Sequence, residues 1–269
     1  MIHFIGFFVK AYIVVLLLRW VLTQQELTFN MVGRSVAKFT NFFAAGKPKV
    51  LVDRLTPAII IVITFIYGLL VSLFSNGFFQ SMRFAFVSVI SFITLFFIIC
   101  ILLGSLASPG TGTFPLFFYR LGNIWVQIVR KVIRIRSNLI VIPAIALLGL
   151  FYVASVTLVE IVVALVAGLA INPPVIVGAA AVSLLFDLVS LLRYLAYVIM
   201  VRALLSWVSP DPHNLVVQLV YYITEPVISL FRRFVPPIGP VDLSALVAMI
   251  ALFFVEGVIR AALLKFFVL

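Results

Sequence analysis

The side chains that could carry out chemistry are few and scattered along this 269-residue chain. His3 is expected near the outer surface of the membrane and His213 at the start of a helix on the cytoplasmic side. The two histidines therefore cannot jointly hold haem or a metal ion. The lone cysteine, Cys100, excludes disulfides and thiolate clusters. The sequence contains no Ser-His-Asp set, P-loop or glycine-rich dinucleotide turn. We therefore expect no catalytic residue, no cofactor, no metal site and no enzyme activity.

Two carboxylates, Glu160 and Asp187, lie at similar distances on either side of a hairpin signal, Asn172-Pro173-Pro174. An antiparallel hairpin would place them at one depth in the membrane, where they would mark its outer interface. The sharper alternative is a possible ion-coupling pair. The apolar runs 139–171 and 175–207 are each longer than a bilayer requires. We expect residues 161–186, between the two carboxylates, to form a re-entrant or interface-lying hairpin that contacts a partner or another copy of the chain.

Other charges stand inside apolar runs. Arg19 and Arg202 lie close to the cytoplasmic ends of their runs, so we expect them to snorkel to the headgroups. Glu256 and Arg260 are spaced i, i+4, which predicts an ion pair within one helix.

The elements that must position these residues are membrane helices. The chain is 65% hydrophobic with mean hydropathy +1.33, and about 20 apolar residues suffice to cross a bilayer. Six runs reach or approach that length, and Pro57–Phe74 and Phe84–Leu106 carry no charge. The first run lacks a small-residue cleavage site, so we expect it to be retained. The runs are Ile5–Leu22, Pro57–Phe74, Phe84–Leu106, Leu139–Ile171, Val175–Trp207 and Leu243 to the C-terminus. The predicted fold is an all-α polytopic membrane protein of about six transmembrane helices in tandem hairpins with cytoplasmic amphipathic helices.

The positive charges lie mostly between these runs. The chain has 19 Lys and Arg against 8 Asp and Glu. Short basic loops stay cytoplasmic, so segments 23–56, 107–138 and 208–242 predict an inner-membrane protein with both termini on the non-cytoplasmic side. Anionic phospholipids and other membrane proteins are the expected partners, not nucleic acid. The lipid-facing or partner-facing basic foot comprises Arg232, Arg233, Arg130 and Lys131.

One pattern recurs three times, which predicts hairpin repeats at 1–75, 84–171 and 175–269. Asn30 precedes Thr40 by the same spacing as Asn214 precedes Thr224. In the middle segment, Ser108-Pro109 matches Ser209-Pro210. The first two copies are degenerate.

The last copy is locally the clearest. Asp211-Pro212 predicts a helix start with an N-cap and proline at N1. Pro226 predicts a kink or restart of that helix, after which Arg232 and Arg233 would face lipid phosphates.

The stretches ALLSWVSPDPHN and ITEPVISLFRRFVPPIGPVDLS resemble the YggT family of bacterial and plastid membrane proteins. The resemblance is best over about residues 188–262, with weaker copies at 5–75 and 84–160. The signature residues are Arg202, Trp207, Pro210, Asn214, Thr224, Pro226, Pro236, Pro237, Gly239 and Asp242.

The resemblance implies a membrane protein that organises or helps to assemble others. Bacterial members are associated with osmotic or envelope stress and cell division, and plastid relatives with nucleoid partitioning and cytochrome b6 haem attachment. We therefore expect a non-catalytic scaffold or assembly factor, and a small ion-coupled transporter or channel is the alternative.

Overall fold

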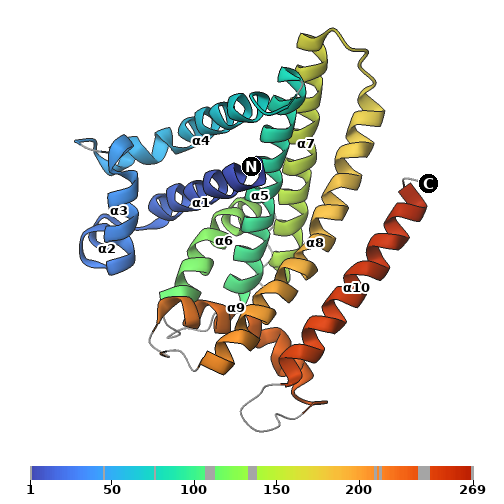
Figure 1. The fold of residues 1–269 in the computed structure, drawn as a ribbon. Helices are drawn as coiled ribbons and strands as arrows, with labels where there is room; N and C mark the ends of the chain where they lie inside the picture. The colour runs from blue at the N-terminus through green and yellow to red at the C-terminus, as the bar shows by residue number, and fades with distance from the viewer. Residues whose placement is uncertain are drawn as a thin grey trace. The chain divides into compact units, whose positions relative to one another are not determined.

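The computed structural model describes residues 2–44, 46–75, 77–106, 113–132, 138–208, 211, 214–235 and 243–267, and all regular secondary structure among them is helical. Figure 1 shows the path of the chain. The helices are α1 (Ile2–Val21), α2 (Gln24–Phe29), α3 (Met31–Ala44), α4 (Lys49–Ser72), α5 (Phe78–Ser105), α6 (Thr113–Val132), the 3-10 turn η1 (Asn138–Ile140), α7 (Val141–Ala167), α8 (Pro173–Val208), α9 (Leu215–Phe231) and α10 (Leu243–Phe267).

Six helices are long and apolar enough to span a bilayer, namely α1, α4, α5, α7, α8 and α10. The predicted class, an all-α multi-pass membrane protein, is confirmed. Four spans begin earlier than predicted, and the difference is largest for α4, which contains Pro57, and for α5, which starts before Phe84. These helices therefore include charged residues such as Lys49 and Arg83, which a purely apolar window excludes.

Helix α9 differs from its prediction at both proline signals. It begins at Leu215, and its N-cap is Asn214, whose side chain accepts a hydrogen bond from the Val216 N–H at 2.9 Å. The predicted start at Asp211-Pro212 was wrong because Asn214 satisfies a free N–H of the first turn. The helix also continues through Pro226 rather than restarting there, and the following turn is held by the fully buried Ile228. Pro212 and His213 lie outside the described residues.

The long apolar hairpin turns earlier than predicted. Gly168 ends α7 in the left-handed conformation (φ 68°), and its N–H bonds to the Ala164 and Leu165 carbonyls. Pro173 is then the first residue of α8, where its missing N–H has no helical partner to lose. Residues 161–167 thus belong to α7 and residues 173–186 to α8. Helix α8 is about 54 Å long, which is longer than a bilayer core.

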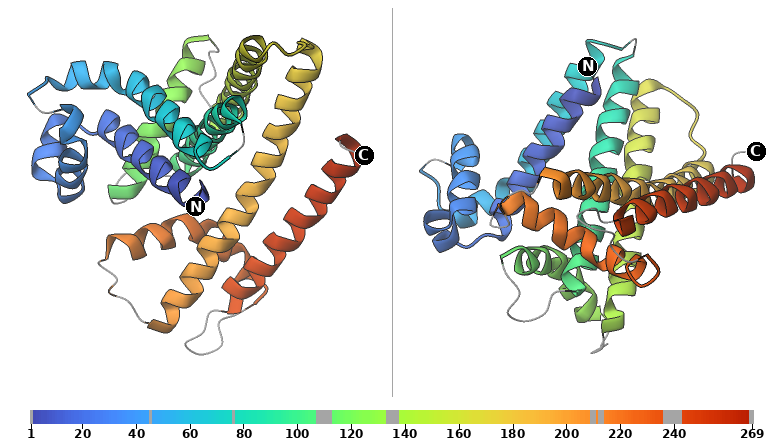
Figure 2. Two further views of the ribbon diagram at one scale, coloured as in Figure 1. Left: turned by 45° about the horizontal axis from the view of Figure 1, so that its top comes forward. Right: turned by 60° about the horizontal axis from the view of Figure 1, so that its bottom comes forward.

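The chain divides into two compact units, residues 1–101 with 120–177 and residues 102–119 with 178–269. In the first unit, α1 lies beside α4 and α3 packs on α1. In the second, α9 crosses α8 and packs on α10 (Figure 2). The core of that unit is Ile199, Ile228, Ala245 and Ala248, one or two residues from each helix.

Candidate functional site

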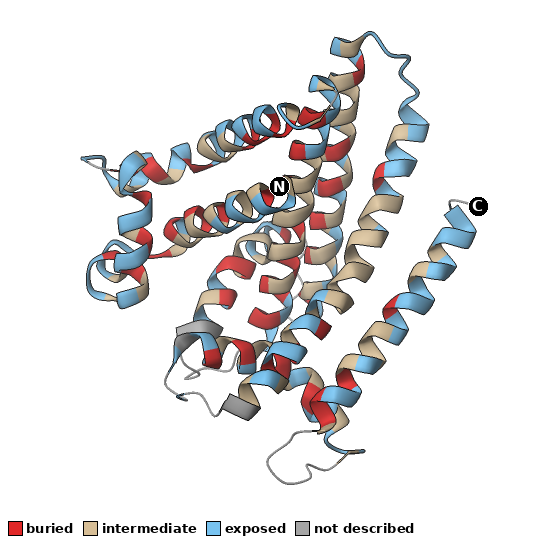
Figure 3. Cartoon of the chain, viewed as in Figure 1, coloured by how far each residue is buried: buried red, intermediate tan, exposed pale blue. Residues whose placement is uncertain are grey.

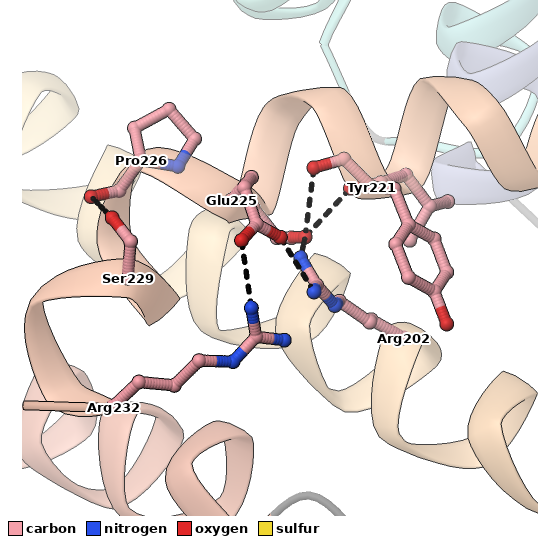
Figure 4. Close-up of polar contacts among 8 residues, drawn as sticks. Arg202, Tyr221, Glu225, Pro226, Ser229 and Arg232 are labelled. Atoms are coloured by element: carbon pink, nitrogen blue, oxygen red, sulfur yellow. Dashed lines mark hydrogen bonds and ion pairs between the residues drawn. The ribbon is translucent and has the colours of Figure 1, made fainter.

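Arg202 on α8 is the most deeply buried cation of the second unit, with 4% of its surface exposed. Its Nη1 donates to Thr224 Oγ1 at 2.9 Å and its Nη2 to Glu225 Oε2 at 2.6 Å. The guanidinium also lies over the Tyr221 ring, 4.2 Å from its centroid (Figure 4). The expectation that Arg202 snorkels to the headgroups was therefore wrong, because α9 supplies a hydroxyl, a carboxylate and a ring that replace the water.

Glu225 joins two arginines. While its Oε2 accepts from Arg202, its Oε1 accepts from Arg232 Nη1 at 2.8 Å (Figure 4). Arg232 is thus held by α9 itself and is not simply directed at lipid phosphates, as the sequence suggested. Arg233 is exposed in the turn that follows α9. Charge-assisted bonds of this kind are the stronger class of hydrogen bond, so they fix how α9 lies on α8.

Thr224 on α9 connects Arg202 to the backbone of α9. Its hydroxyl is fully buried, accepts from Arg202 and donates to the Val220 carbonyl at 2.7 Å. The donor hydrogen and one acceptor position of this hydroxyl are therefore used within the unit.

An open cleft of about 450 Å³ lies along α9 next to this network. Its lining is Leu106, Tyr221, Tyr222, Glu225, Pro226 and Ser229. The Tyr222 hydroxyl donates to the Leu103 carbonyl at 2.8 Å, and its ring stacks on Phe118. Burial raises the pKa of Tyr222, so the phenol stays protonated and keeps this bond. The cleft therefore has a fixed, largely apolar wall and one carboxylate.

The first unit contains the same arginine–threonine bond and the same asparagine N-cap contact. Arg19, with 8% of its surface exposed, donates from Nη1 to Thr40 Oγ1 at 2.6 Å, and Thr40 donates to the Val36 carbonyl at 2.7 Å. Asn30 accepts from the Val32 N–H at 3.1 Å, just as Asn214 does in α9. Arg19 therefore does not snorkel either. Asn41 follows Thr40 where Glu225 follows Thr224, so this copy lacks the carboxylate that joins two arginines.

The middle segment has no arginine at the position that corresponds to Arg19 and Arg202 in the outer copies. When Ser108 is aligned with Ser209, Ile101 corresponds to Arg202. An added Cβ on Gly122 would lie 2.8 Å from backbone atoms of Cys100 and Ile101. Helices α5 and α6 can approach closely here because Gly122 has no side chain.

An ion pair joins α2 to α6 in the first unit. Arg120 Nη1 bonds to Glu26 Oε1 at 2.7 Å, and the Thr23 N–H bonds to Glu26 Oε2 at 2.8 Å. Burial alone would raise the pKa of Glu26, but the bonds from Thr23 and Arg120 outweigh it and hold that pKa below its usual value. Arg130 and Lys131, ten residues further along α6, are exposed.

The two residues of the expected ion-coupling pair belong to different units. Glu160 on α7 accepts from Arg83 Nε at 2.6 Å, a partner that sequence analysis missed because it lies 77 residues away. Asp187 lies on α8 and is half-buried. Within the described ranges, no three His, Cys, Asp or Glu residues gather as a metal site would require. Several signature positions lie outside the described residues, namely Pro210, Pro236, Pro237, Gly239, Asp242 and the side chain of Trp207.

Residues 182–263, which include the network around Arg202, match the protein-family model described as CCB3/YggT. This part of the chain is similar to the YggT family. The predicted resemblance is therefore confirmed over its best-matching segment. No solved structure matches the chain.

Among the curated relatives of the chain, an uncharacterized protein of Pseudomonas aeruginosa is 38% identical over 61 residues, covering 23% of this chain and 31% of the relative. The uncharacterized protein YggT of Escherichia coli is 27% identical over 84 residues, covering 31% of this chain and 45% of the relative. An uncharacterized protein of Vibrio alginolyticus is 42% identical over 60 residues, or 22% of this chain and 32% of the relative. The chain thus matches less than half the length of each of these proteins.

Proposed function

We propose that this protein is a non-catalytic inner-membrane scaffold or assembly factor for membrane complexes. The observation that carries the proposal is that polar residues of the matched segment bond to one another. Arg202, Thr224 and Glu225 bond to one another, so they build a fixed α8–α9 corner rather than a reaction centre. A rigid corner with an exposed cation and an open cleft is suited to holding a partner.

The partner-facing part would be the turn after α9. Arg233 and Phe234 are exposed there, and the Glu225–Arg232 bond limits the freedom of the chain just before them. A cation beside an exposed aromatic ring fits either an acidic segment of another membrane protein or anionic headgroups. In the topology we propose, this turn is cytoplasmic and both termini lie on the opposite side. Roles in osmotic or envelope stress, or in cell division, follow from the family resemblance alone.

Three hairpin repeats at 1–75, 84–171 and 175–269 are part of the proposal. The matching Arg19–Thr40 and Arg202–Thr224 bonds support a common design for the outer two. Repeats would present several similar corners to one complex, and simultaneous engagement of several corners raises avidity.

Co-purification from native membranes in a mild detergent, followed by mass spectrometry, tests the proposal. We expect a reproducible set of membrane proteins that is lost when Arg232 and Arg233 are both changed to Gln. Lys265→Gln, which removes an exposed cation from the last turn of α10, is the control and should retain the set. Arg232→Lys distinguishes the loss of charge from the loss of the Glu225 bond. A preparation without stable partners would contradict the scaffold role.

The transporter alternative is tested by ion flux in liposomes, in which flux abolished by Asp187→Asn would replace the proposed function. Ion coupling requires a carboxylate that exchanges its counter-ion. The Glu160–Arg83 pair favours the scaffold, because its carboxylate is already engaged by a guanidinium at 2.6 Å.

A further inference from the structure

Three charged residues of the second unit meet between α8 and α10. Arg193 Nη2 donates to Glu256 Oε1 at 2.5 Å, and Arg260 Nη1 donates to the same oxygen at 3.4 Å. The predicted Glu256–Arg260 pair is therefore present, but the shorter bond comes from the other helix. The Glu256 side chain is 5% exposed, so the carboxylate is enclosed by its two cations.

This cluster, Arg193, Glu256 and Arg260, lies far from the helix ends. Residue 193 is about 22 Å along the helix from the end of α8 at residue 208, and residue 256 is about 20 Å from the start of α10 at residue 243. The remaining 11 residues of α10 after Glu256 extend about 16 Å. Since the hydrocarbon core is about 30 Å thick, Glu256 falls inside it if α10 spans the bilayer.

The cluster carries more positive than negative charge. Two guanidiniums share one carboxylate oxygen, and their side chains remain 37% and 40% exposed. Arg260 also lies over the Phe186 ring at 5.6 Å, which attracts a cation without neutralising it. In the middle of a membrane span the exposed part of a guanidinium faces hydrocarbon, where charge is costly unless an anion pairs with it.

The surface around the two arginines is apolar and uncovered. Tyr194 and Tyr197 flank Arg193, Ile259 and Leu264 flank Arg260, and all four are exposed. Figure 3 shows that α10 is exposed or half-buried along most of its length. An exposed apolar face with a central pair of cations matches a helix that is apolar except for one acid.

We propose that this α8–α10 face docks a transmembrane helix of a partner protein through a carboxylate placed at mid-membrane depth. The carboxylate would bond to Arg260 and Arg193 and balance the charge of the cluster. The depth of Glu256 favours a protein carboxylate over a lipid phosphate, because phosphates lie at the headgroup level. The inference rests on the proposed scaffold function and names the chemistry of one partner.

The test uses synthetic transmembrane helices rather than an unknown partner. Two Leu/Ala helices of about 22 residues, one with a central Glu and one with Gln, are incorporated with the labelled full-length protein into phosphatidylcholine vesicles at neutral pH. Association is followed by energy transfer. We expect the Glu helix to bind roughly five- to thirtyfold more tightly than the Gln helix.

Arg260→Gln should reduce this preference to less than about twofold, because it removes the excess cation and leaves the Arg193–Glu256 pair intact. Lys265→Gln, an equal loss of charge on the same helix, should keep it. Circular dichroism and gel filtration confirm that both variants fold.

Equal binding of the Glu and Gln helices, or a preference for the Glu helix that survives Arg260→Gln, would overturn the inference. So would binding of phospholipid through Arg260 without any preference for the Glu helix. Self-association of the wild-type protein that Arg260→Gln abolishes would overturn it as well. A preference that appears only in Asp187→Asn would also overturn it, because Asp187 would then already be the counter-ion. If the helix-binding experiment fails, the proposed docking site is wrong, whereas the scaffold role is still tested separately by co-purification.

Discussion

Replacing Thr224 by Val tests whether the arginine bond fixes α9 on α8. Valine keeps the shape of threonine but removes the acceptor for Arg202 Nη1, leaving a charged donor in a site where the arginine is 4% exposed. Because hydrogen bonds to charged groups contribute about 1.5–3 kcal/mol, we expect the free energy of unfolding to fall by that amount. Thr224→Ser, which keeps the hydroxyl and loses a methyl group, should cost about 1 kcal/mol.

A double-mutant cycle with Arg202→Met isolates the bond. In the Arg202→Met background the hydroxyl no longer serves a guanidinium, so Thr224→Val should cost less than about 0.5 kcal/mol, giving a coupling of roughly 1–2.5 kcal/mol. The measurement is unfolding by SDS in mixed micelles, followed by far-ultraviolet circular dichroism. Additive effects within about 0.5 kcal/mol would refute the reasoning, since independent sites add to that precision.

Three further changes test other parts of the structure. Thr40→Val should destabilise the first unit by about 1.5–3 kcal/mol, because it removes the acceptor for Arg19. On heating, a thiol dye should then label the single, buried Cys100 at a lower temperature than in the wild type. An unchanged labelling temperature would contradict the equivalence of the Arg19–Thr40 and Arg202–Thr224 bonds. Gly122→Ala should cost about 1–3 kcal/mol because the new methyl group meets backbone, whereas Gly178→Ala, which has open space around it, should be neutral or stabilising in the same thermal assay. Because the pKa of Glu26 is lowered in the folded state, the ionised carboxylate contributes to the free energy of unfolding at neutral pH. This contribution to stability is lost as pH falls below about 4.5 and through the folded pKa. Stability profiles of the wild type and Glu26→Gln should therefore converge in acid, and a constant gap would contradict the pairing with Arg120.

The spans could be predicted from the sequence because a bilayer sets the length of apolar sequence that crosses it. Their exact starts could not, since a helix that spans a membrane can begin in polar sequence, as α4 does at Lys49. The start of α9 was misplaced because Asp211 and Asn214 are both good N-caps, and the choice between them depends on tertiary packing.

The site was predicted in part. Residue spacing indicated that Asn214 and Thr224 belong to one motif, but it did not reveal that Thr224 binds Arg202 from another helix. Snorkelling was a reasonable expectation for an arginine near the end of an apolar run. It failed for Arg202 because a hydroxyl and a carboxylate on α9 reach the guanidinium before the headgroups do. Such pairings depend on how helices pack, and helical periodicity within one segment cannot supply them.

The scaffold role is tested most directly by crosslinking in intact cells from the turn that follows α9. A photo-crosslinking amino acid replaces Phe234, which is 82% exposed and next to Arg233, and the control replaces Leu73, which is 75% exposed at the end of α4. We predict a discrete adduct with another membrane protein from position 234 that Arg233→Gln weakens and that position 73 does not give. Adducts with lipid alone, or the same adducts from both positions, would contradict the proposed function.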